Sequence, residues 1–130
     1  MPEPLGRLLV VDDEQAVREL VELAAEACGW SCDGAGTVAD VEHRTVADYD
    51  LVLVDLALGD ADGTSVLELL ARRSVRADVL LMSGGGREGF LRAAVVACQD
   101  GLAIAGTLHK PFPLADLREA LGACVGKRRG

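Results

Sequence analysis

The sequence predicts an α/β domain built on a doubly wound parallel sheet of five strands. First, five short apolar runs alternate with five stretches of helical periodicity along the 130 residues. Second, the strongest runs are apolar on both faces, which indicates strands that are covered by helices on both sides. Third, the length suits one domain, so we expect a single domain over residues 1–130 with its core at about 7–125.

Each predicted strand is a run of apolar, often branched residues. The runs are Leu8–Val11, Trp30–Asp33, Leu51–Val54, Val79–Met82 and Leu102–Leu108. The third run is the clearest, because four consecutive branched residues leave neither face polar. The second run is the weakest, and the fifth is low in bulk because of Ala103, Ala105 and Gly106.

A stretch of helical periodicity follows each strand. The residues of the first helix that are expected to face the core are Val17, Leu20, Val21, Ala24 and Cys28. Arg18 is placed on the opposite, solvent-facing side, and Gly29 is expected to end this helix in the left-handed conformation. Further helices are expected at Val38–Thr45, from a Thr64 cap to Arg73, at Phe90–Gly101 and at Leu114–Val125, before a short basic tail.

Charge and composition exclude several classes of function. The chain has 21 acidic and 13 basic residues, a net charge of −8 and a pI near 4.6, which argues against binding nucleic acid or an anionic membrane surface. No signal peptide and no membrane-spanning run is visible, so we expect a soluble, cytoplasmic protein. The four cysteines form no C-x-x-C pair and are interpreted as buried thiols in a reducing compartment, rather than as zinc ligands: Cys28, Cys32, Cys98 and Cys124.

Chemically reactive side chains stand directly after four of the five strands. Asp12 and Asp13 follow the first strand, Asp55 the third, Ser83 the fourth and Lys110 the fifth. Taken singly, each suits an ordinary helix cap or turn. Because a doubly wound domain gathers the carboxyl ends of its strands at one edge, we expect these side chains to lie together.

Clustered carboxylates repel one another unless a cation or a proton is present. Mg²⁺ suits such a cluster, because it takes few protein ligands and keeps several waters. Lys110 adds a compact positive charge at the same edge, and Ser83 adds a hydroxyl. A carboxylate that attacks phosphorus, with a metal ion and a lysine to neutralise charge, defines a site for a phosphoryl group.

Four segments carry a family resemblance over about Leu8–Val125: Val10–Glu14, Val54–Leu58 leading to Asp62-Gly63, Met82–Gly84 and Lys110–Phe112. In order and spacing they resemble the receiver domain of two-component response regulators. The resemblance implies a CheY-like, flavodoxin-like (βα)5 fold with strand order 2-1-3-4-5. It also implies that a sensor histidine kinase or a phosphotransfer protein donates a phosphoryl group to one Asp with Mg²⁺. Such a domain is no enzyme beyond its own phosphorylation and dephosphorylation.

The resemblance further implies a role for each residue at the strand ends. Asp55 is the phosphoacceptor, and Lys110 pairs with the phosphoryl group. Ser83 is the switch hydroxyl that moves toward a phosphoryl oxygen. The implied metal ligands are Asp13, Asp55, the backbone carbonyl of Ala57 and, through a bound water, Asp12. The peptide bond before Pro111 is implied to be cis.

The sequence departs from the family pattern at three places. Thr107 stands where the family usually has the aromatic residue that reports phosphorylation, so a different readout is expected. Gly59 replaces a common proline and loosens its loop. Gly84–Gly86 leave the loop after Ser83 without side chains, and Gly85 hints at a short-lived phosphoryl-aspartate.

The leading hypothesis is a switch that changes its partner through the face of the fourth helix (Phe90–Gly101), the fifth strand (Leu102–Leu108) and the fifth helix (Leu114–Val125). A degenerate receiver that ignores phosphate is the main alternative, supported by Thr107 alone. A HAD-type phosphatase needs a second acid two residues after its nucleophile, and here Ala57 occupies that place. In a flavodoxin-like protein Asp12 and Asp13 would repel the phosphate of FMN. The chain resembles receivers attached to EAL-type output domains more than chemotaxis receivers at Leu81–Gly84, Gly101-Leu102, Gly106–Leu108 and Lys110–Phe112. The kinase, the output partner, an output domain and a homodimer stay open.

Overall fold

Five parallel strands form the central sheet of the computed structural model, which describes residues 6–58, 61–73, 76–84, 91–95, 99 and 101–129. The strands are β1 (Arg7–Val11), β2 (Ser31–Ala35), β3 (Leu51–Asp55), β6 (Asp78–Ser83) and β7 (Ala103–His109). Their order is β2-β1-β3-β6-β7. Numbered along the sheet strands alone, this is 2-1-3-4-5, so the predicted fold class is confirmed.

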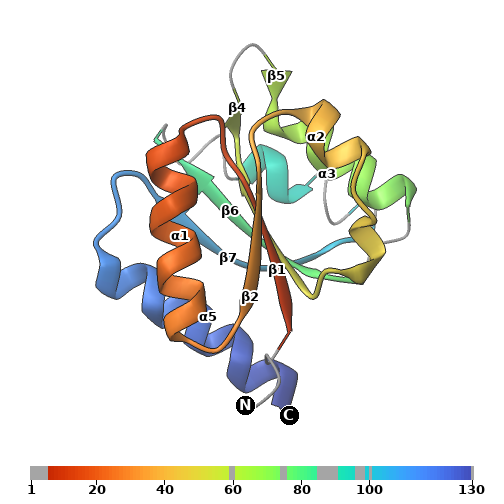
Figure 1. The fold of residues 1–130 in the computed structure, drawn as a ribbon. Helices are drawn as coiled ribbons and strands as arrows, with labels where there is room; N and C mark the ends of the chain where they lie inside the picture. The colour runs from red at the N-terminus through yellow and green to blue at the C-terminus, as the bar shows by residue number, and fades with distance from the viewer. Residues whose placement is uncertain are drawn as a thin grey trace.

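Helices cover both faces of the sheet (Figure 1). Helices α1 (Gln15–Ala27) and α5 (Leu114–Arg129) pack on one face, and α2 (Val38–Glu42) and α3 (Gly63–Arg72) on the other. Helical residues 91–95 lie on the α2–α3 side, where Ala93 joins the core. Alternate strand residues supply the two cores: Val52 and Val54 face α3, whereas Leu51 and Leu53 face α1 and α5.

The predicted core face of α1 was partly wrong. Val21 and Ala24 are buried as expected, but Leu20 is 36% exposed, and Arg18 is half-buried over β2. The buried stripe is rotated because α1 packs against both the sheet and α5, which periodicity alone does not specify. Gly29 does end the helix region in the left-handed conformation, with φ 92°.

Other boundaries also differ from the sequence prediction. Helix α2 ends at Glu42, and a 3-10 turn follows at Val46–Asp48. Thr64 lies inside the first turn of α3 rather than before it, and α5 continues to Arg129, through the predicted basic tail. An antiparallel hairpin, β4 (Ala57–Leu58) and β5 (Ala61–Asp62), was not predicted. Part of the predicted helix Phe90–Gly101 lies outside the described residues.

The cysteines in the described part of the chain are thiols rather than disulfides. Cys124 is buried, whereas Cys28 and Cys32 are half-buried, so their predicted burial is only partial. Burial, followed by the nearby carboxylate of Glu22, raises the pKa of Cys32 to about 12. Cys32 is therefore an unreactive thiol at neutral pH. Cys98 lies outside the described residues.

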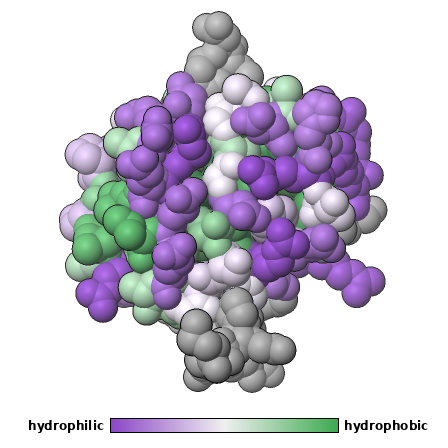
Figure 2. All heavy atoms as spheres, viewed as in Figure 1, coloured by the Kyte–Doolittle hydropathy of each residue, from purple (hydrophilic) through white to green (hydrophobic). Residues whose placement is uncertain are grey.

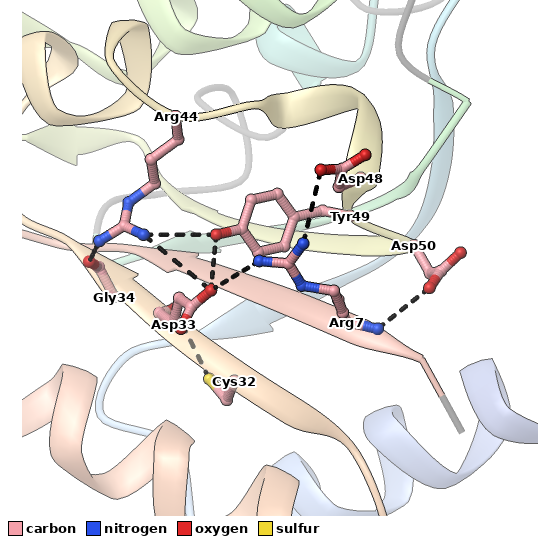
Figure 3. Close-up of polar contacts among 8 residues, drawn as sticks. All are labelled: Arg7, Cys32, Asp33, Gly34, Arg44, Asp48, Tyr49 and Asp50. Carbon is pink, nitrogen blue, oxygen red and sulfur yellow. Dashed lines mark hydrogen bonds and ion pairs between the residues drawn. The ribbon is translucent and has the colours of Figure 1, made fainter. Parts of the chain in front are cut away.

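A polar network fastens β2 to its neighbours at the edge of the sheet (Figure 3). The Tyr49 hydroxyl donates to Asp33 Oδ2 at 2.7 Å, and Arg7 Nη2 donates to the same oxygen at 3.2 Å. The Arg7 guanidinium also lies 4.7 Å from the centre of the Tyr49 ring. Arg44 Nη2 donates to the backbone oxygen of Gly34 at 2.7 Å. The sequence indicated nothing distinctive at Asp33, because its partners come from β1 and from the segment before β3.

No helix in the described part of the chain is long and apolar enough to cross a membrane.

Tyr49→Phe removes only the hydroxyl that donates to Asp33, and we expect it to lower the free energy of unfolding by about 1 kcal/mol at pH 7. The hydrogen bond from Tyr49, aided by Arg7, lowers the pKa of Asp33 in the folded state. The stabilisation is therefore present above the unfolded-state pKa and is lost as the pH falls through the folded-state pKa. Urea unfolding followed by the fluorescence of buried Trp30 measures this difference across the acid range. A difference that stays constant with pH would contradict it.

Candidate functional site

The sheet brings the predicted strand-end residues to one edge. Asp12 follows β1, Asp55 ends β3, Ser83 ends β6, and Lys110 directly follows β7. Asp12, Asp55 and Ser83 are buried, with exposures of 0%, 2% and 6%. Strand pairing sets this arrangement, because Asp55 lies opposite Met82 in the register and Ser83 lies opposite His109.

Lys110 joins the two buried carboxylates. Its Nζ lies 2.6 Å from Asp12 Oδ2 and 3.1 Å from Asp55 Oδ2, and its side chain is 15% exposed. A third, looser contact of 3.7 Å reaches Glu14 Oε1, a residue that the sequence analysis did not single out. The backbone N–H of Lys110 donates to the oxygen of Ser83 at 2.8 Å, which fixes the end of β7 beside β6.

The second oxygen of each buried carboxylate accepts a backbone hydrogen bond. Asp12 Oδ1 accepts from the N–H of Glu14 at 2.9 Å, and Asp55 Oδ1 accepts from the N–H of Ala57 at 3.0 Å. These contacts fix the local shape of the two loops, because each carboxylate accepts a hydrogen bond from the backbone N–H two residues later in the chain. The backbone N–H of Ala57 thus lies beside Asp55, and the role of the Ala57 carbonyl as a metal ligand stays a prediction.

Burial and charge oppose each other within this cluster. Burial raises the pKa of Asp12, while the hydrogen bond from Lys110 works in the opposite direction. Partial burial alone would lower the pKa of Lys110, but its hydrogen bonds to Asp12 and Asp55 outweigh burial and raise it. Lys110 therefore stays cationic and partly neutralises the two acids.

Ligand atoms of Asp12, Asp13 and Asp55 all lie within 4.8 Å of one another. Asp13 is exposed, so the cluster opens to solvent on that side. Three carboxylate oxygens at this spacing fit a hard divalent cation such as Mg²⁺, which takes oxygen ligands and retains waters. The residues present can thus hold a metal ion.

An open hollow of about 470 Å³ lies next to Lys110. Its described lining residues are Glu14, Val17, Gly84, Lys110 and Pro111. The Lys110–Pro111 peptide bond is cis, as the resemblance implied. Thr107, three residues before Lys110, is exposed on β7. Gly59, Gly85 and Gly86, the other departures from the family pattern, lie outside the described residues.

Comparison with known proteins identifies the family. The family model for the response regulator receiver domain matches residues 8–122, and the chain belongs to this family. Transcriptional regulatory protein PmrA of Pectobacterium parmentieri is 29% identical over 126 residues, which cover 95% of this chain and 54% of that protein. Cell cycle response regulator CtrA of Brucella abortus is 26% identical over 95% of this chain and 52% of its own length. The chain thus spans about half the length of these relatives.

Solved structures show the same fold. A CheY-like receiver domain protein from Methanospirillum hungatei has a TM-score of 0.78 at 22% identity, over 95% of this chain and 96% of that one. A response regulator from Colwellia psychrerythraea has a TM-score of 0.77 at 24% identity, over 95% and 98% of the two chains. Together with the family model, this fold makes the chain a receiver domain of two-component response regulators. A specific relation to the receivers of EAL-type regulators stays a prediction.

Lys110→Met leaves Asp12 and Asp55 without their shared counter-charge. Without Mg²⁺ we expect the free energy of unfolding to fall by about 2 kcal/mol, because buried carboxylates lose their partner. Mg²⁺ should stabilise this variant more than the wild type, since the ion supplies the missing charge. Urea unfolding in EDTA and in Mg²⁺ tests both points, with Lys127→Met, at the other lysine, as the control. Equal stability of Lys110→Met and wild type in EDTA would disprove the expected loss of stability without Mg²⁺.

Proposed function

We propose that Asp55 accepts a phosphoryl group from a histidine kinase or a phosphotransfer protein, and that Mg²⁺ bound by the acidic cluster is required. The observation that carries this proposal is the geometry of Asp55: a buried carboxylate 3.1 Å from Lys110 Nζ, in a three-carboxylate cluster. Asp12, Asp13 and Asp55 would hold the ion together with the backbone carbonyl of Ala57, and Asp12 would act through a bound water.

In this scheme a carboxylate oxygen of Asp55 forms a bond to phosphorus while the bond from phosphorus to the donor imidazole nitrogen breaks. The electron pair of the broken bond stays on that nitrogen. Mg²⁺, when bound, supplies positive charge to the phosphoryl oxygens. Lys110 moves from the carboxylates to pair with a phosphoryl oxygen, and the Ser83 hydroxyl, at the adjacent strand end, donates to another.

The surface beside the site suits a protein donor. The hollow lies between the start of α1 and the residue after β6, and Lys110, which lines it, contacts Asp55. Leu20 and Leu23 of α1 and Leu114 of α5 are exposed, by 36%, 69% and 48%. Figure 2 shows hydrophobic surface on the side of the molecule where α1 and α5 lie. Exposed apolar residues on these two helices suit docking of a protein partner better than binding of a small substrate.

We propose that the signal leaves through the face formed by helical residues 91–95, β7 and α5. Ser83 and Lys110 occupy the ends of β6 and β7, so a movement at the phosphoryl group acts directly on β7. Exposed Thr107 offers no aromatic ring to rotate, so displacement of the β7 backbone is the proposed readout. The domain acts as a phosphoacceptor rather than as an enzyme on an outside substrate, and it works in the cytoplasm, where its donor lies. The proposal also includes an output domain that receives the signal, which can be of the EAL type.

Asp55→Asn should reduce acyl-phosphate labelling by acetyl phosphate and Mg²⁺ to background, because an amide oxygen is a poor nucleophile toward phosphorus. Hydroxylamine-sensitive incorporation of radioactive phosphate measures this. Glu68→Gln, at an exposed acid on α3, is the matched control and should label like the wild type. Undiminished labelling of Asp55→Asn would refute Asp55 as the acceptor.

Beryllofluoride with Mg²⁺ mimics the phosphoryl group and should shift the amide NMR signals of β7 and α5 in the wild type. Asp55→Asn should show no such shifts, because the mimic needs the carboxylate. Mg²⁺ alone serves as the reference state. If neither β7 nor α5 responds in the wild type, the phosphate-independent receiver becomes the better reading.

A further inference from the structure

Arg18 holds the peptide group between Asp12 and Asp13, although the chemistry proposed above assigns it no role. Its Nη1 donates to the backbone oxygen of Asp12 at 2.7 Å. The backbone N–H of Asp12 donates to the oxygen of Ala35 on β2 at 3.0 Å. With the two carboxylate contacts described above, the backbone N–H, the backbone oxygen and both carboxylate oxygens of Asp12 all have partners.

Two glycines make room for this arginine. A Cβ atom at Gly34 would lie 3.1 Å from Arg18 Cδ, and one at Gly36 would lie 3.1 Å from Arg18 Nη1. The Arg18 side chain therefore lies against the bare backbone at the end of β2 and just beyond it, and a side chain at either glycine would crowd it. Arg18 is half-buried because the two glycines leave room for its side chain, so it is not simply a solvent-exposed charge.

We propose that Arg18 is a positioning residue for Mg²⁺ binding, which orients the Asp12–Asp13 peptide group so that the Asp13 carboxylate is aimed at the ion before the ion arrives. This inference rests on the proposed function. Asp13 is exposed, and the orientation of the Asp12–Asp13 peptide group sets where its Cα–Cβ bond points. Hydrogen bonds that hold ligand-bearing groups in place tune metal affinity in this way.

The sign of the effect separates positioning from simple charge. The guanidinium is a cation close to a cation site, so by charge alone its removal would strengthen Mg²⁺ binding. Positioning predicts the reverse, since a free peptide group must be ordered each time the ion binds. The two explanations thus give opposite changes in one measured constant.

The experiment is a Mg²⁺ titration of the whole chain, followed by the backbone amide NMR signals of Asp13 and Ala57. We expect Arg18→Gln to weaken Mg²⁺ binding about tenfold. Arg18→Lys should recover part of this loss, because it keeps a donor without the planar fork. Arg72→Gln, the same change at an exposed arginine on α3, should bind as the wild type does. Unchanged or tighter binding by Arg18→Gln would overturn the inference.

Gly36→Ala provides a second test that leaves Arg18 in the sequence. It should also weaken Mg²⁺ binding, and it should add nothing in an Arg18→Gln background, because the added methyl group crowds the Arg18 guanidinium that contacts Asp12. Full additivity, or a loss of stability in EDTA with an unchanged Mg²⁺ dissociation constant, would show a merely structural role. A wild type that binds no Mg²⁺ would instead refute the proposed function.

Discussion

Asp12 and Asp55 are two carboxylates buried side by side, and the positive charge of Lys110 makes that arrangement tolerable. Isolated buried carboxylates of like charge would repel each other and take up protons. The Nζ atom of Lys110 contacts both carboxylates, at 2.6 and 3.1 Å, and the backbone N–H of Lys110 donates to the oxygen of Ser83 on β6. The end of β7 is therefore tied electrostatically to the ends of β1 and β3. A ligand that draws Lys110 away from these acids acts on β7 at once, which is the physical basis of the proposed switch.

The parallel sheet is what brings these groups together. Lys110 is separated from Asp12 by 98 positions and from Asp55 by 55 positions in the sequence. Crossover connections place the carboxyl ends of all five strands at one edge, so residues that follow different strands become neighbours. Most of the site was predictable for this reason: Asp12, Asp13, Asp55, Ser83 and Lys110 each stand directly after an apolar strand. Strand-end position was the informative signal, more than any single motif.

The predictions failed where packing between elements decides. Periodicity placed Leu20 in the core and Arg18 in solvent, but α1 rests against both the sheet and α5, and this rotates its buried stripe. The β4–β5 hairpin and the network around Asp33 depend on partners that local sequence does not reveal. Glu14 and Arg18 were overlooked in the site for the same reason. The signal that could have found Arg18 is the pair of glycines, Gly34 in β2 and Gly36 directly after it.

The sequence by itself determined the fold class, the family and the acids, hydroxyl and lysine of the site, because strand hydrophobicity and strand-end position are local properties of the chain. Tertiary structure decided how those groups are balanced. It set which carboxylate oxygen faces Lys110, how far Asp12 is buried, and which side chain holds the Asp12–Asp13 peptide group. These depend on distances between elements that meet only after folding, so no local pattern specifies them.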